Sequence, residues 1–303
     1  MLTAGMRETS VAQYRRAVTA FLVFLAFNAV EPEEPCEYDD LLCEYQAFGN
    51  AGKPVSRSHF SALIAGVERV LPHLKGTLEV AHAVLASWSV SFTPKHTLPL
   101  SRAHAILLAA RMATLGFRRP AALLLLQYGR GLRPGEALSL RACDVILPHE
   151  VSAAGGGLLL LGARSGTKSK RPQVVRVTDR VLLHIMALFR SVTGPDQRLT
   201  GIRTLGGYNF IISRAKEALG LAHVPWTGHT ARAGFVTDQY LSGTSREIIA
   251  GVTRHQSLRT LQMYLDATAV AAGQFQHEYQ KLAPLVEWAK EVVMEEIGLG
   301  FTC

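Results

Sequence analysis

The sequence predicts a mainly helical α+β protein in which one small antiparallel sheet accompanies the helices. Apolar residues recur at helical spacing along most of the chain, and strand-like segments occur in one short region. A length of 303 residues favours two domains, of about 100 and 200 residues. The segment 92–100 contains two prolines and favours an extended linker, so we expect a helical N-terminal domain over 1–95 and a second domain over 101–303.

The N-terminal domain is expected to consist of helices separated by polar breaks. The helical patterns cover 10–28, 36–48, 56–72 and 76–89. In the first of them, five large side chains fall on one face, as expected for a helix that packs in a core: Tyr14, Val18, Phe21, Leu22 and Leu25. The apolar run 17–30 is too short to cross a bilayer, so we expect an intracellular protein with no membrane partner.

The second domain is expected to hold the sheet between two groups of helices. Helical patterns cover 101–115, 118–129, 178–192, 206–219, 230–241, 244–251, 257–264 and 273–296. Strands are expected at 143–147, 158–163 and 173–177, with a turn at 155–157. Pro134 stands where a first helical turn accepts proline, which predicts a further short helix after the turn that contains Arg133.

The charge distribution favours a polyanionic partner for the second domain. The net charge is +8, yet residues 1–100 hold eight Lys and Arg against ten Asp and Glu. The segment 164–214 has ten basic and two acidic residues, a bias that favours a phosphate-facing surface. The residues expected to contact this polyanionic partner are Arg164, Arg171, Arg176 and Arg254. The four cysteines lack metal-ligand spacing, so we expect no bound metal.

Candidate chemical residues lie in the second domain at defined spacings. His229 and Arg232 open a predicted helix, and their spacing of three places both side chains on one face. His255 follows 23 residues after Arg232, and Tyr264 follows nine residues after His255. Far upstream, Arg133 is the third residue of the motif Gly-Leu-Arg-Pro-Gly-Glu, which ends at Glu136.

These motifs resemble those of the tyrosine recombinase (phage integrase-like) family. The family pattern is Gly-Leu-Arg-x-x-Glu, a hairpin lysine, His-x-x-Arg, a Gly-His-like box and a tyrosine nine residues later. All elements occur here in that order, over about residues 101–270, and the helical N-terminal region is similar in kind to the core-binding (DNA-clamping) domain of the family. The resemblance implies a site-specific recombinase or integrase of DNA, with Tyr264 attacking phosphorus to form a 3′-phosphotyrosyl link.

Cleavage of an anionic phosphodiester requires neutralised charge and a positioned nucleophile. Arg133 and Arg232 can fork onto the non-bridging oxygens, for which lysine is a poor substitute. The resemblance implies that His229 transfers the tyrosine proton, that His255 donates a hydrogen bond to the phosphate, and that a hairpin lysine protonates the leaving 5′-oxygen. The covalent link conserves the energy of the phosphodiester, so no cofactor, metal or ATP is expected.

Two lysines compete for the role of general acid, and two positions depart from the family pattern. Lys168 and Lys170 lie two residues apart on one side of an extended segment, and Lys168 aligns better with the Thr-Lys-Thr-like hairpin of the family. Glu136 is expected to hold Arg133 rather than to react. Ala233 stands where the family commonly has a second histidine, and Thr253-Arg254 replaces the usual Leu-Gly before His255.

The partners expected are double-stranded DNA and further copies of the chain. In the family, a tail helix such as 273–296 often docks onto a neighbouring protomer and gives a cyclic tetramer on two DNA duplexes. The apolar stripe of this tail could equally pack on its own domain: Leu282, Leu285, Val286, Ala289, Val292 and Val293. A monomeric type IB topoisomerase-like enzyme and a domesticated DNA-binding protein that no longer cuts are the alternatives. The target site and the kind of element, phage, transposon or host system, stay open.

Overall fold

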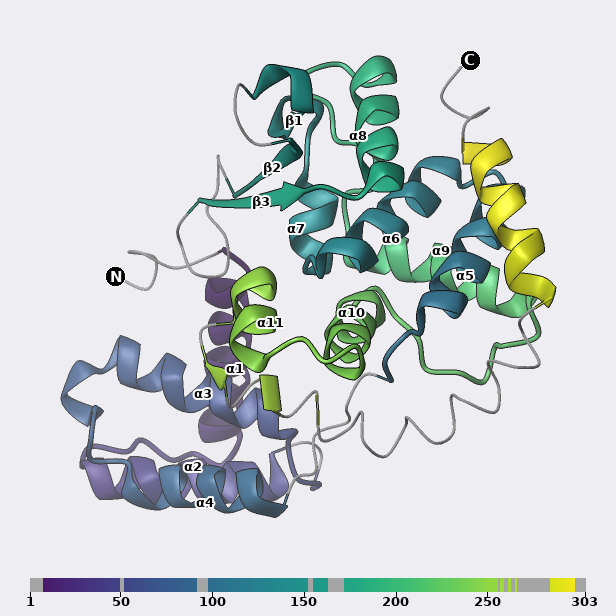
Figure 1. Cartoon of the computed structure of the whole chain (residues 1–303). Coiled ribbons are helices and arrows are strands. Elements are labelled where there is room, and N and C mark those ends of the chain that lie inside the picture. The colour runs from purple at the N-terminus through teal and green to yellow at the C-terminus, as the bar shows by residue number, and fades with distance from the viewer. Residues whose placement is uncertain are drawn as a thin grey trace. The chain divides into compact units, whose positions relative to one another are not determined.

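The computed structural model of this chain describes residues 8–49, 52–91, 98–151, 155–162, 172–255, 257–258, 261–262, 265 and 284–297. By its internal contacts the chain separates into two compact units, Met1–Lys95 and His96–Cys303, which divide within the proline-containing segment (Figure 1). The described residues are mainly helical and include one small antiparallel sheet, so the predicted fold class is confirmed.

The first unit consists of helices around a core of its own. Its elements are α1 (Glu8–Phe27), α2 (Pro35–Phe48), α3 (Arg57–Val70), the short 3₁₀ turn η1 (Pro72–Leu74) and α4 (Glu79–Ser91). Ser56 caps α3 by accepting from the backbone N–H of His59, so this helix begins one residue later than predicted. The buried carboxylate of Asp39 on α2 accepts from the N–H groups of Val80 and Ala81 at 2.8 Å each, which satisfies the first turn of α4.

The predicted core face of α1 is correct except at one position. Phe21 and Leu25 are buried, and the ring of Phe21 packs edge-on against Tyr45 of α2 with 5.5 Å between ring centroids. Leu22 is 56% exposed, so its assignment to the core face was wrong. It follows Phe21 directly, and the 100° turn per residue carries its side chain past the edge of the buried stripe.

The second unit packs its helices around α5 and α6. Its helices are α5 (Arg102–Thr114), α6 (Arg118–Arg130), α7 (Pro134–Ser139), α8 (Arg180–Val192), α9 (Leu205–Ala218), α10 (Thr230–Leu241), α11 (Arg246–Thr253) and a last helix over 284–297, yellow in Figure 1. α5 is buried on most of its faces, and its buried side chains are mainly small alanines together with Leu107, Leu108 and Met112. Short 3₁₀ turns are η2 (Ala142–Asp144) and η3 (Pro148–Glu150).

The sheet has three antiparallel strands in the order β1-β2-β3: β1 (Val145–Ile146), β2 (Gly157–Leu161) and β3 (Gln173–Val177). Leu159 pairs with Val145 on one side and with Val175 on the other, and all three side chains are buried. The first strand is shorter than predicted because the residues before it form η2, where the N–H of Arg141 donates to the carboxylate of Asp144 at 2.9 Å.

The last helix packs within the second unit. Val286, Ala289 and Val293 are buried in the core of that unit, and Arg118 of α6 donates two hydrogen bonds, of 3.0 and 2.9 Å, to Glu296. Leu285, predicted on the same stripe, is 49% exposed. Residues 273–283 of the predicted tail helix lie outside the described residues. No helix in the described ranges is long and apolar enough to cross a membrane.

The chain that enters the second unit contacts the helix that carries the candidate residues. The N–H of Leu100 donates to the carbonyl of Thr230 at 3.4 Å, and Gly234 of α10 faces the carbonyl of Leu100 so closely that an added Cβ would overlap it. This close approach explains why residue 234 has no side chain.

Gly234→Ala is therefore expected to lower the free energy of unfolding by about 1–3 kcal/mol, because either α10 or residues 98–100 must move. Gly251→Ala on α11 is the matched control, since nothing lies within 4 Å of an added Cβ there and alanine favours helix over glycine by about 0.5–1 kcal/mol. Urea unfolding of the full chain measures both variants, and equal stabilities would contradict the prediction.

Candidate active site

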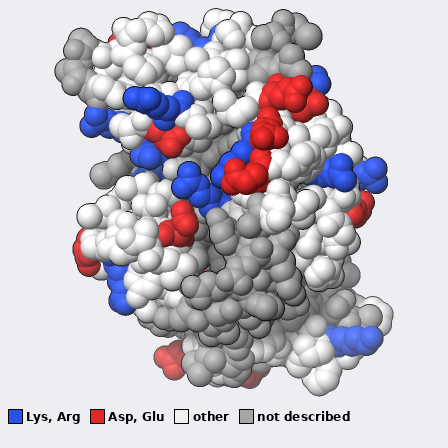
Figure 2. Space-filling view, turned by 45° about the vertical axis from the view of Figure 1, so that its right-hand side comes forward, with Lys and Arg blue, Asp and Glu red and all other residues white. Residues whose placement is uncertain are grey.

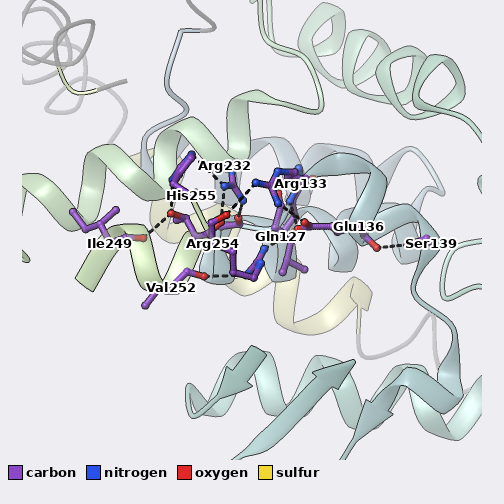
Figure 3. Close-up of polar contacts among 12 residues, drawn as sticks. Gln127, Arg133, Glu136, Ser139, Arg232, Ile249, Val252, Arg254 and His255 are labelled. Carbon is purple, nitrogen blue, oxygen red and sulfur yellow. Dashed lines mark hydrogen bonds and ion pairs between the residues drawn. The ribbon is translucent and has the colours of Figure 1, made fainter. Parts of the chain in front are cut away.

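Five side chains from separate segments of the second unit come together in one polar cluster (Figure 3): Arg133, Glu136, Arg232, Arg254 and His255. They come from the turn between α6 and α7, from α7 itself, from α10, and from the end of α11. Residues more than 100 positions apart in the chain therefore contribute to one site, as the motifs predict.

Arg133 is fixed by the turn that carries it. α6 ends at Gly131, whose φ of 56° is a left-handed conformation that glycine adopts readily. Arg133 itself is extended and caps α7, with Pro134 as the first helical residue. Its backbone N–H donates to Glu136 Oε2 at 2.9 Å, and its Nη1 donates to Oε1 at 2.7 Å. The side chain stays 24% exposed, so it can still reach a ligand.

Glu136 is a buried carboxylate between two arginines. Its side chain is 7% exposed, and Arg254 Nη2 donates to its Oε2 at 2.7 Å. Burial by itself raises the pKa of a carboxyl, but the charge of Arg254 and the hydrogen bonds from Arg133 outweigh it and hold the pKa of Glu136 below its ordinary value. Glu136 is thus ionised at neutral pH and holds the guanidinium groups of Arg133 and Arg254.

Arg232 joins the three segments of the site. Its guanidinium donates from Nη1 to the carbonyl of Gly131 at 2.7 Å and from Nη2 to the carbonyl of Thr253 at 2.6 Å. Nη2 also lies 3.2 Å from His255 Nε2. The residue is 3% exposed, so its charge acts in a poorly solvated site where electrostatic interactions are strong.

The partners of His255 define its protonation. An arginine can only donate, so Nε2 accepts from Arg232 and the ring proton lies on Nδ1. Nδ1 lies 2.6 Å from Thr253 Oγ1, and that hydroxyl donates to the carbonyl of Ile249 at 2.6 Å. Burial and, after it, the charges of Arg232 and Arg133 lower the pKa of His255 to about 4. His255 is therefore neutral at physiological pH, and in this arrangement its Nε2 is an acceptor rather than the predicted donor.

A buried glutamine, which the motifs do not include, connects two turns of the site. Gln127 of α6 is fully buried, and its Nε2 donates to the carbonyl of Leu132 at 3.3 Å and to that of Gly228 at 2.6 Å. Its Oε1 accepts from the hydroxyl of Tyr208 at 3.1 Å. The two carbonyls immediately precede Arg133 and His229 in the chain. The sequence feature that could have revealed Gln127 is its position as a single polar residue at the end of an apolar helical run.

His229 is exposed at the start of α10, one turn before the buried Arg232. Two hydrogen bonds fix the backbone of the preceding turn. The N–H of Gly228 donates to Asn209 Oδ1 at 2.8 Å, and the N–H of Thr227 donates to Thr230 Oγ1 at 2.8 Å. The exposed side chain of His229 thus extends from a backbone segment that these hydrogen bonds hold in place.

Comparison with known proteins gives a consistent set of relatives. No model of a protein family matches the sequence. The chain is 26% identical over 279 residues to tyrosine recombinase XerC of Methylobacterium sp. (strain 4-46), a match that covers 84% of this chain and 82% of the relative. It is 25% identical over 281 residues to the XerC of Methylobacterium nodulans, over 85% of this chain and 82% of the relative.

Solved structures agree on the fold. The XerH site-specific recombinase bound to a palindromic difH substrate, in a post-cleavage complex, superposes with a TM-score of 0.56 at 14% identity, over 90% of this chain and 79% of that chain. A lambda integrase (75–356) dimer bound to a COC′ core site gives a TM-score of 0.55 at 14% identity, over 86% of this chain and 90% of that one. The chain is thus similar over most of its length to tyrosine recombinases, which confirms the resemblance that the motifs predict.

Part of the predicted recombinase site lies outside the described residues. These positions are Arg164, Lys168, Lys170, Arg171 and Tyr264. On either side of Tyr264, Leu261 and Leu265 are buried in a cluster with Val236 of α10 and Ile249 of α11. The backbone carbonyl of Ile249 also accepts from Thr253, so this cluster adjoins the residues that hold His255.

On the face shown in Figure 2, the described Lys and Arg side chains form separate groups, several with an Asp or Glu alongside. Arg176, a predicted DNA contact, is exposed on β3. Arg254, the other described contact of that prediction, has a side chain that is 8% exposed and bonded within the site. Within the described ranges, no group of His, Cys, Asp and Glu side chains could hold a metal ion.

The lowered pKa of His255 predicts that the stability of the second unit depends on pH. In the unfolded chain histidine binds a proton near pH 6.5, whereas in the folded site it does so only near pH 4. Stability from neutral His255 is therefore complete above pH 6.5 and lost as pH falls toward 4. Urea unfolding at pH 7 and pH 5 should show a larger loss for the wild type than for His255→Gln. Equal losses of unfolding free energy in the two proteins would mean that the pKa of His255 is not lowered in the folded state.

Proposed function

We propose that this chain is a site-specific DNA recombinase that cuts and rejoins DNA through a 3′-phosphotyrosyl intermediate at Tyr264. The observation that carries the proposal is the convergence of Arg133, Arg232 and His255 on one site in a chain similar to tyrosine recombinases. The relatives and the compared structures are named as tyrosine recombinases and integrases, and the two structures described above are bound to recombination sites. Double-stranded DNA is accordingly the proposed substrate.

The proposed reaction needs cations and proton transfers rather than an external energy source. The phenolic oxygen of Tyr264 attacks phosphorus, the bond from phosphorus to the 5′-oxygen breaks, and the 3′-phosphate becomes esterified to the tyrosine. The phenolic proton passes to His229, and a lysine protonates the departing 5′-oxygen. A 5′-hydroxyl from another strand reverses these steps. Because one phosphodiester replaces another, no ATP is consumed.

The arginines supply the charge that this step requires. Arg133 has an exposed edge, and its guanidinium can donate to two oxygens of a phosphate in a fork. Arg232 lies deeper, where its attraction for an anion is screened little by solvent. Both are held by backbone carbonyls or a carboxylate before substrate arrives, and such preorganisation is the main source of electrostatic catalysis.

The first unit is proposed to act as a DNA clamp of low charge. Its helical composition is of the kind that the core-binding domain of the family shows, yet residues 1–100 carry more acidic than basic side chains. We therefore assign most of the salt-dependent grip on DNA to residues 101–303, which hold 24 of the 32 Lys and Arg of the chain.

Assembly into a tetramer on two DNA sites is the finer form of the proposal. A cavity of about 550 Å³ in the second unit is lined by Leu125, Phe235 and Val252 and by Val293 and Met294 of the last helix. Apolar side chains from the tail of a neighbouring protomer fit such a site. One observation favours a monomeric topoisomerase-like enzyme instead, because the helix over 284–297 packs in its own unit. Supercoil relaxation without two-duplex synapsis would establish that alternative.

Tyr264→Phe is expected to abolish covalent attachment to DNA while retaining DNA binding, since only the nucleophilic oxygen is removed. DNA duplexes that this variant binds are first selected from a random-sequence pool, which supplies the substrate. Versions of these duplexes with a nick next to each candidate phosphate are then used, because cleavage there releases a short fragment that diffuses away and the covalent adduct accumulates. Denaturing electrophoresis measures the adduct. Adduct with Tyr264→Phe would assign another nucleophile, and its absence with the wild type would favour a DNA-binding protein that no longer cuts.

Lys168→Ala is expected to slow adduct formation by about 10²–10⁴-fold, the contribution of a general acid, and Lys170→Ala much less. A substrate in which sulfur replaces the 5′-bridging oxygen supplies a leaving group that needs no proton, so it should restore the rate of the variant that lacks the acid. If the sulfur substrate restores the rate of Lys170→Ala and not that of Lys168→Ala, Lys170 is the general acid instead.

A further inference from the structure

Arg254 occupies a backbone position that favours glycine. It ends α11 with φ of 60° and ψ of 42°, in the left-handed region. Within the described part of the chain, Ala29 and Arg254 are the only non-glycine residues with positive φ. The family usually has glycine directly before the histidine of this box. A long charged side chain at a strained position next to a reactive site calls for a specific interaction that holds it there.

The guanidinium of Arg254 provides that interaction and is directed into the site (Figure 3). Nη2 donates to Glu136 Oε2 at 2.7 Å, and Nη1 donates to the carbonyl of Val252 at 2.9 Å. The side chains of Arg254 and Glu136 are 8% and 7% exposed. Without Glu136, the buried charge of Arg254 would lose the carboxylate that compensates it. Arg254 is therefore engaged inside the protein rather than open to a phosphate.

Arg254 also affects the charge that Arg133 can offer to a substrate. Arg133 and Glu136 alone would form a neutral pair, in which the carboxylate cancels the cation that the phosphate needs. Because Arg254 binds the other carboxylate oxygen, Oε2, the cluster of Arg133, Glu136 and Arg254 carries one net positive charge. Arg133 is the more exposed of the two arginines, so that charge is presented at its accessible edge.

The backbone of Arg254 orients the same guanidinium. Arg133 Nη2 donates to the carbonyl of Arg254 at 3.2 Å, while its Nη1 is held by Glu136. Both terminal nitrogens of Arg133 are thus fixed by groups whose position depends on residue 254. The following residue is His255, so the left-handed turn also sets the direction in which that ring leaves α11.

We propose that Arg254 is a positioning residue for DNA cleavage: by neutralising and holding Glu136, it keeps Arg133 oriented and positively charged toward the scissile phosphate. This inference rests on the proposed function. Arg254 acts through Glu136 and Arg133 and does not itself contact DNA, in contrast to the DNA contact that the sequence predicts at this position.

The test compares variants that separate three properties of Arg254: its positive charge, its planar guanidinium group and its left-handed backbone conformation. Arg254→Gly removes the guanidinium and suits the left-handed conformation, so this variant is expected to fold. Arg254→Lys keeps a charge but loses the planar fork. Arg246→Ala is the matched control, because Arg246 is an exposed arginine on the same helix.

Adduct formation is measured in a single turnover with the nicked duplexes, at protein concentrations that bind all the DNA. In Arg254→Gly the rate should fall on the order of 100-fold, the effect of a misplaced catalytic group, with an unchanged dissociation constant for DNA. Arg254→Lys should recover only part of the rate. Added guanidinium ion should partly restore Arg254→Gly, whereas urea should not, and neither should accelerate the wild type or Arg246→Ala.

A second readout does not depend on activity. Because Arg254 interacts with ionised Glu136, the stability deficit of Arg254→Gly should be largest at neutral pH and shrink as Glu136 is protonated at lower pH. Because the charge of Arg254 also lowers the pKa of the neighbouring His255, this pH dependence should vanish in a background that carries both Glu136→Gln and His255→Gln. A role in packing alone would leave the deficit independent of pH.

The outcomes are distinct. A wild-type rate in Arg254→Gly overturns the proposal. So does a defect that disappears once all the DNA is bound, because it would identify a DNA contact. Absence of adduct in the wild type overturns the proposed function instead, and the pH dependence of stability then decides by itself whether Arg254 holds Glu136.

Discussion

The buried guanidinium of Arg232 is the contact on which the site depends. It donates to the carbonyl that ends α6 and to the carbonyl that ends α11, and it adjoins His255. Carbonyl oxygens at helix C-termini carry partial negative charge and lack intrahelical donors, so an arginine between two such ends satisfies both and acquires a fixed orientation. The guanidinium of Arg232 is therefore already oriented before any phosphate binds. The conformational entropy lost in ordering this side chain belongs to the free energy of folding and not to that of binding.

Sequence reasoning could find the members of this site because the chemistry restricts their type and spacing. Arginines that fork, a histidine three residues before one of them, and a tyrosine nine residues after another histidine form a pattern that coincidence rarely produces. The helices and the three-stranded sheet followed from periodicity, and errors occurred where local geometry outweighs it. Leu22 lies past the edge of a buried stripe, and the 3₁₀ turn of η2 takes residues that alternate like a strand.

What the pattern could not supply is the set of contacts between distant segments. Gln127 looks like one polar residue in an apolar helix, and its function as a bridge depends on Gly228, 101 positions away in the chain. Arg254 looks like one more basic residue in a basic domain, and charge counting places it with the DNA contacts. Its burial against Glu136, 118 positions away, reverses that interpretation. Charge patterns reveal which residues are cations, whereas the fold determines which anion each of them meets.

The protonation of His255 shows how substrate can complete a site that is only partly set. Burial lowers its pKa first, and the neighbouring cations Arg232, Arg133 and Arg254 lower it further. A phosphodiester between those arginines adds a negative charge beside the ring and draws guanidinium donors away from Nε2, so both effects raise the pKa of His255. For His255 to donate to the phosphate, as the proposed reaction requires, its Nε2 must carry a proton, and a raised pKa favours that state. The arginines that keep His255 unprotonated in the free protein are thus also the groups that attract the anion, and the bound anion would favour protonation of His255.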